Sequence, residues 1–121
     1  MLKFKQARWR FKTPFTSKKL HLVKEIKNHP SWKGDVSLCE AAALLRDHSP
    51  FTYVLSSGMD HNHFFLSYVD FNHVVKHKNV RIILDKGQWM VKNGTGVSYD
   101  EVATLIPNCL HCSANVCKPL I

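Results

Sequence analysis

The sequence predicts an α+β fold in which a central antiparallel β-sheet is flanked by one α-helix on each face. Three apolar, β-branched segments follow one another at residues 51–55, 64–69 and 74–84. The links between them are short and turn-like, and short links join strands that run antiparallel. Because the first segment is apolar on both of its faces, we expect a helix to cover each face of the sheet.

Two further segments carry the signals of the flanking helices. Ser37 followed by Glu40 has the pattern of a capping box, and the alanine-rich segment behind it predicts a helix over residues 38–46. Ser98 followed by Glu101 repeats the pattern further along the chain. We therefore expect Ser98 to cap a second helix, whose apolar stripe is formed by Val102, Leu105 and Ile106.

Positive charge is concentrated in the first part of the chain. The formal net charge of the 121 residues is +8, and nine Lys and Arg residues stand among residues 1–27 against one acid, Glu25. From residue 28 onward eight basic residues face eight acidic ones. We divide the chain into a basic arm at residues 1–31, with a strand-like segment and a short helix, and a domain at residues 32–121. A nucleic-acid-binding role would depend on the arm alone, so we do not favour it.

Composition excludes several classes of protein. A hydrophobic content of 45% is typical of a globular domain, and no apolar run approaches the roughly 20 residues of a membrane span. The sequence has no secretory signal, and four cysteines are too few for a disulfide-stapled fold. No nucleophile–base arrangement or glycine-rich phosphate loop is recognisable, so we expect no enzyme. We expect a monomeric, cytoplasmic protein without cofactors.

Several pieces of the sequence resemble the Src homology 2 (SH2) domain, the module that binds phosphotyrosine peptides. The match begins at Trp32 and covers the chain to about Leu120. The order and spacing of the matching pieces carry the resemblance more than any single piece does. The matching pieces are SLCEAAALL for the first helix, TYVLSS for the FLVR strand, FLSYVD for the next strand, VKH, YDEVATLI for the second helix, and VCKPL.

The resemblance implies a pocket for phosphotyrosine, but it aligns uncharged residues with the expected cations. The arginine of the FLVR strand aligns with Leu55, and two further basic positions align with Leu38 and Asn79. Hydroxyls and amide N–H groups in the turn after the strand can still contact an anion. The phosphate-binding residues that we expect are Ser56, Ser57, Gly58, Lys76 and His77, with Arg8 and Arg10 of the arm as displaced cations.

Residues that follow phosphotyrosine dock on loops beyond the central sheet in this family. The resemblance places Lys78, Gly94 and Thr95 in that peptide groove. The alternative is a degenerate domain that binds unphosphorylated protein partners or acts as a scaffold. The resemblance leaves open both a signalling adaptor and a microbial effector acting in the host cytosol.

The C-terminal cysteines allow two interpretations. Cys109, His111, Cys112 and Cys117 suggest a zinc site, but His111 would point away from the face shared by Cys109 and Cys112 on a helix. Free cysteines beside apolar helix residues fit the pattern better. We therefore expect no metal site.

Overall fold

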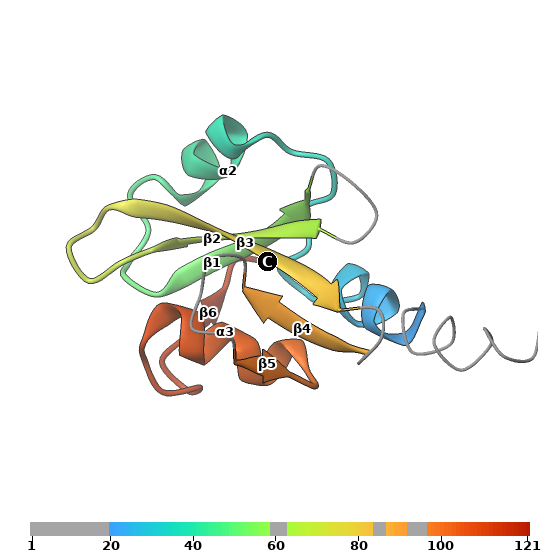
Figure 1. Ribbon diagram of the computed structural model, residues 1–121. Coiled ribbons are helices and arrows are strands. Elements are labelled where there is room, and N and C mark those ends of the chain that lie inside the picture. Colours follow the sequence, from blue (N-terminus) through green and yellow to red (C-terminus); the bar gives the residue numbers. More distant parts are fainter. Residues whose placement is uncertain (1–19, 59–62, 84–86, 92–96) are drawn as a thin grey trace, which may run out of the picture.

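The structure is a computed structural model, and it describes residues 20–58, 63–83, 87–91 and 97–121. Residues 20–27 are helical, and α2 spans Leu38–Leu45 and α3 Val102–Leu110. Six strands form one sheet in the order β5-β4-β3-β2-β1-β6 (Figure 1). The strands are β1 Thr52–Ser57, β2 His63–Val69, β3 Val75–Ile83, β4 Gln88–Val91, β5 Ser98–Tyr99 and β6 Lys118–Pro119.

The first three strands form the antiparallel meander that the sequence predicts. β1 pairs antiparallel with β2, and β2 with β3. On its other side β1 pairs in parallel with β6, and Trp32 forms a parallel bridge with Leu55. The N–H of Leu55 donates to the carbonyl oxygen of Ser31 at 3.0 Å, and the N–H of Lys33 donates to that of Leu55 at 2.8 Å. Strand β1 therefore has neighbours along both edges.

Helices cover both faces of this sheet, as predicted (Figure 1). On the α2 face, Val54 and Val69 pack with Ala41 and Leu45 of α2. On the α3 face, α3 and helix 20–27 cover one larger core. Its members include Leu22, Ile26, Tyr53, Leu55, Phe64, Leu66, Trp89, Val102 and Leu105. Successive strand residues point to opposite faces, so Leu55 belongs to the α3 face and Ser56 to the α2 face.

Local capping differs between the two helices. The capping box of α2 is present, with the Ser37 Oγ accepting from the Glu40 N–H at 3.0 Å. The prediction that Ser98 caps α3 is wrong, because Ser98 lies in β5 and its hydroxyl donates to Gln88 at 2.9 Å. The N-cap of α3 is Glu101, whose side chain makes no capping hydrogen bond.

The capping acceptor of α3 comes from helix 20–27 instead. One carboxylate oxygen of Glu25 accepts from the backbone N–H of Val102 at 3.0 Å. The other accepts from the indole Nε1–H of Trp89 at 3.3 Å. A single carboxylate thus joins helix 20–27 to β4 and to the start of α3.

A second carboxylate organises the turn between β2 and β3. One oxygen of Asp70 accepts from the N–H groups of Asn72 at 2.9 Å and Val74 at 3.0 Å, and Lys76 lies 3.3 Å from the other. The backbone hydrogen bond from Val74 is the main cause that lowers the pKa of Asp70, with smaller contributions from Asn72 and Lys76.

Replacing Glu25 with alanine should destabilise the whole domain. The change leaves the buried indole N–H of Trp89 and the first N–H of α3 without their acceptor, which costs about 1–3 kcal/mol in the free energy of unfolding. Urea unfolding measures this loss. Glu101→Ala is the control, because that side chain caps nothing; an equal loss in both variants would contradict the role given to Glu25.

Replacing Asp70 with alanine should destabilise the domain at neutral pH and much less in acid. The folded-state pKa of Asp70 is lowered, so its stabilisation is complete above the unfolded value of about 3.9 and disappears as pH falls through the folded value. Urea unfolding of the wild type and of Asp70→Ala at pH values between about 7 and 3 measures this convergence. Asp35→Ala, which removes an exposed carboxylate, is the control, and a convergence of the same size in this variant would contradict the role given to Asp70.

Candidate functional site

Polar side chains gather on the α2 face where β1, β2 and β3 lie side by side. The strand register sets Ser56 opposite Phe65, and Phe65 opposite Asn79. The row on one side of these residues contains Val54, Ser67 and His77. The row on the other side contains His63 and Arg81. Side chains opposite one another in a sheet lie within contact distance on one face. These rows define the candidate site.

Two atoms of this site are buried without a hydrogen-bond partner among the described residues. They are the Oγ of Ser56 and the Oδ1 of Asn79, which stand on either side of Phe65 in one row. A buried polar group that lacks a partner costs about 1–3 kcal/mol. The floor of the site therefore has hydrogen-bonding capacity that a bound polar group can satisfy.

Ser67 and His77 form the next row and already interact. The Oγ of Ser67 lies 2.6 Å from the Nδ1 of His77, and Ser67 is fully buried. Burial lowers the pKa of His77. When the ring is neutral and Ser67 donates to Nδ1, the remaining proton lies on Nε2, where it can be donated to a ligand.

Arg81 adds a permanent cation to the same face. It lies two residues beyond Asn79 on β3, opposite His63 of β2, and its side chain is exposed. Arg81 is not among the site residues predicted from the sequence. The period of two from His77 through Asn79 was the signal that could have found it.

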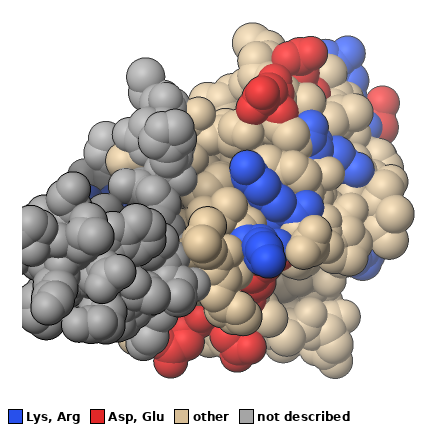
Figure 2. Space-filling model, turned by 90° about the vertical axis from the view of Figure 1, so that its right-hand side faces the viewer, with Lys and Arg blue, Asp and Glu red and all other residues tan. Residues whose placement is uncertain are grey.

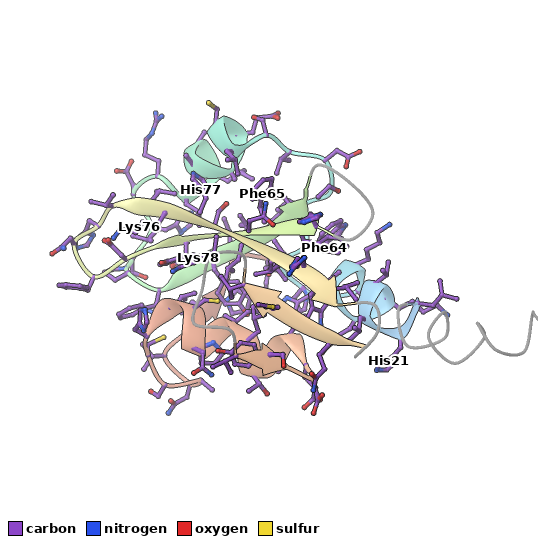
Figure 3. The ribbon with its side chains drawn as sticks, viewed as in Figure 1. His21, Phe64, Phe65, Lys76, His77 and Lys78 are labelled. Atoms are coloured by element: carbon purple, nitrogen blue, oxygen red, sulfur yellow. The ribbon has the colours of Figure 1, made fainter. Side chains whose placement is uncertain are left out.

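Phe65 occupies the centre of the site and is half-buried. Figure 3 shows Phe65 and His77 on the side of the sheet toward α2, and Phe64 and Lys78 on the opposite side. The Phe65 ring thus lies between the two hydrogen-bonding groups that lack partners. It can stack on a flat ligand group, or it can fill the space that such a group would need.

The turn residues predicted to bind phosphate separate into different environments. Ser56 faces the site, whereas Ser57 points to the other face and its N–H donates to the carbonyl oxygen of Gly34 at 2.9 Å. The N–H of Gly58 donates to the carbonyl oxygen of His63 at 2.9 Å, and a Cβ at position 58 would lie 2.4 Å from that oxygen. Of the three predicted residues Ser56, Ser57 and Gly58, Ser56 is thus the one whose side-chain donor faces the site.

The residue aligned with the family's strand arginine does not face this site. Leu55 is fully buried in the core of the α3 face, whereas His77 lies on the α2 face. Leu55 and His77 therefore cannot line one pocket. The β1 residue that shares a face with His77 is Ser56.

The other predicted residues lie elsewhere. Lys76 is 58% exposed and pairs with Asp70, on the opposite side of β3 from His77. Lys78 lines a hollow of about 310 Å³ on the α3 face, called here the α3-side hollow, together with Val91, Val97, Tyr99, Asn108, Cys109 and His111. Arg8, Arg10, Gly94 and Thr95 are outside the described residues.

The first half of β3 separates the candidate site from the α3-side hollow. Strand β4 pairs with β3 only from Val80 to Ile83. Within the described parts of the chain, residues 75–79 pair with β2 alone. An extended chain crossing their other edge would contact the α2 face on one side and the hollow on the other.

The face shown in Figure 2 is not uniformly basic. Figure 2 shows Lys and Arg side chains near the middle of the face turned to the viewer, with Asp and Glu at its upper and lower margins. Among the described residues no group of three or more His, Cys, Asp and Glu side chains is placed to hold a metal ion. No helix in the described ranges is long and apolar enough to cross a membrane.

Comparison with known proteins identifies the fold. No sequence profile of a protein family matches the chain, and no curated protein matches it. The chain is similar in structure to the SH2 domain of a CRK/CRKL homologue from Monosiga brevicollis, solved by NMR in solution. The two share 17% sequence identity and a TM-score of 0.53 over 64% of this chain and 72% of that one. The chain thus has the SH2-like α+β fold that its sequence predicts.

Proposed function

We propose that this domain binds an anionic peptide of the phosphotyrosine type, with the phosphate on the α2 face of the sheet. The observation that carries the proposal is the pair of buried polar groups without partners, Ser56 and Asn79, beside Ser67 and His77. A phosphate offers several strong acceptor oxygens, which match the donor hydroxyl of Ser56, whereas the Oδ1 of Asn79 is an acceptor and needs a donor such as a peptide N–H.

His77 and Arg81 supply positive charge in place of a strand arginine. Hydrogen bonds to an ionised group are about twice as strong as those between neutral groups, so a cation on this face matters more than a further hydroxyl. Arg81 lies on the same face of β3 as His77 and keeps its charge at every relevant pH. Arg8 and Arg10 of the arm stay predictions as additional cations.

The peptide chain continues across the edge of residues 75–79. Its next residues reach the α3-side hollow, where Lys78 and Tyr99 lie. The backbone groups at this edge, which no described strand pairs, can hydrogen-bond the crossing chain. We place the peptide groove here, with Gly94 and Thr95 as further predicted contacts.

Phe65 favours a second candidate function, the binding of an unphosphorylated protein segment. Its ring occupies the centre of the α2 face, between Ser56 and Asn79. If this ring blocks phosphotyrosine, affinity comes from the β3 edge and the α3-side hollow instead. Matched peptides with and without phosphate distinguish the two functions.

The phosphorylated peptide should bind more tightly than its tyrosine twin, and Arg81→Ala should remove most of the difference. Loss of a charge-assisted hydrogen bond weakens binding about tenfold or more. Fluorescence anisotropy with both peptides measures the ratio of the two affinities. Arg46→Ala is the matched control. This exposed arginine is the C-cap residue of α2 and is not part of the rows that define the candidate site.

Equal affinities of the wild type for the two peptides would support the second function. A preference for phosphate that survives Arg81→Ala would contradict the role of Arg81. In the second function, Phe65→Ala should create a preference for phosphate, because it empties the centre of the site.

Binding of the phosphorylated peptide should depend on pH through His77. The pKa of His77 is lowered, so in the free domain the imidazolium form is lost as pH rises through a value below about 6.5. The attraction between imidazolium and phosphate therefore weakens as pH rises from about 5.5 to 7.5. Phosphate itself gains charge near pH 6, which acts in the opposite direction.

The variant His77→Gln separates these two effects. It retains a hydrogen-bond donor but does not titrate, so its affinity should follow the phosphate charge alone. The ratio of wild-type to variant affinity should fall as pH rises. A ratio that stays constant over this range would exclude His77 as a ligand of the phosphate.

A further inference from the structure

Two thiols meet between the end of α3 and the start of β6. Cys112 follows His111, the C-cap residue of α3, and Cys117 directly precedes β6. Both are free cysteines, and their Sγ atoms lie 2.8 Å apart. This separation is only about 0.75 Å longer than the S–S bond of a disulfide, about 2.05 Å. A small movement is enough to bring the two sulfurs to bonding distance.

The backbone holds both cysteines in place. The N–H of Cys112 donates to the carbonyl oxygen of Pro107 at 3.2 Å, inside α3. After Cys117, the N–H of Lys118 donates to the carbonyl oxygen of Phe51 at 2.9 Å, beside β1. The approach of the thiols is therefore imposed by α3 and by the sheet.

The connection between the two cysteines is short and internally bonded. The N–H of Val116 donates to the carbonyl oxygen of Ser113 at 3.0 Å, and the Cys117 Sγ donates to the same oxygen at 3.6 Å. This turn brings Cys117 back toward the end of α3. It gives the pair a geometry that a freely moving loop would not maintain.

The two thiols have different surroundings. Cys112 lines a hollow of about 400 Å³ with Pro107, Asn108, His111 and Ser113, which gives a small oxidant a path to this residue. Burial and the hydrogen bond with Cys112 raise the pKa of Cys117 to about 12. Cys117 therefore keeps its proton at neutral pH, and we assign the first reaction to Cys112.

We infer that Cys112 and Cys117 form a redox-active dithiol that a hydroperoxide converts to an intramolecular disulfide. The Cys112 thiolate attacks one oxygen of hydrogen peroxide, the O–O bond breaks, and the departing hydroxide takes up a proton to leave as water. The product is a sulfenic acid at Cys112. The sulfur of Cys117 then displaces hydroxide from the Cys112 sulfur, and the Cys117 proton leaves with it as a second water. Two thiols are oxidised and one peroxide is reduced.

The disulfide would tie the end of α3 to β6 through a closed loop of residues 112–117. A cross-link restricts the unfolded chain, so the oxidised domain should unfold at a higher temperature. His111 and Asn108 line both this hollow and the α3-side hollow, so the cross-link lies beside the proposed peptide groove. The inference itself does not depend on that proposed function.

The test uses the whole chain carrying Cys39→Ser, which removes the exposed thiol. Treatment with hydrogen peroxide, followed by denaturation and alkylation, should reduce the three remaining thiols to one. The intact mass should fall by two hydrogen atoms, and peptide mapping should link Cys112 to Cys117. The Tm should rise by several degrees and return to its first value after reduction.

Cys112→Ala and Cys117→Ala are the matched controls, and neither should show the mass change or the rise in Tm. The mapping on the Cys39→Ser protein does not depend on whether these variants fold. Full alkylation of Cys112 and Cys117 after peroxide treatment would overturn the inference. A link from Cys109 to either partner, or a link between two chains, would overturn it as well.

Discussion

Burial of β1 on both of its faces is the constraint on which the rest of the structure depends. The strand contributes Val54 to the core under α2 and Leu55 to the larger core under α3. β6 and the segment around Trp32 occupy its outer edge, and β2 occupies the other. Because side chains alternate along a strand, a change of one residue in register would exchange the two cores. The β1 residue available to the candidate site is fixed by this alternation.

The candidate site is the polar remainder of the face that α2 covers only in part. Apolar contacts hold the part of that face near Val54 and Val69, while Ser56 and Asn79 take the neighbouring row. The site therefore rests on strands, whose positions are fixed by the cores, and not on the turn after β1. Placement on strands keeps hydrogen-bonding groups in fixed positions, which favours recognition of a ligand of defined shape.

Sequence patterns predicted what depends on neighbours along the chain. The capping box of α2 and the three-strand meander are of this kind. The cap of α3 was wrong because its acceptor, Glu25, lies 77 residues away from Val102. The sheet face to which Leu55 points and the position of Arg81 in the site follow from the register of the sheet. Motif alignment alone does not give that register. The Cys112–Cys117 contact depends equally on tertiary structure.

The edge of β3 at residues 75–79, which no described strand pairs, bears on whether copies of the domain can associate. Unpaired strand edges invite further strands to add, and lysines along an edge discourage such pairing. Among the described residues, β3 residues 75–79 pair with β2 alone, and Lys76 and Lys78 stand on this half of the strand. A strand adding alongside β3 would have to bring its own chain past both charges. A chain that crosses this edge at right angles, as in the proposed peptide complex, meets far less of this barrier.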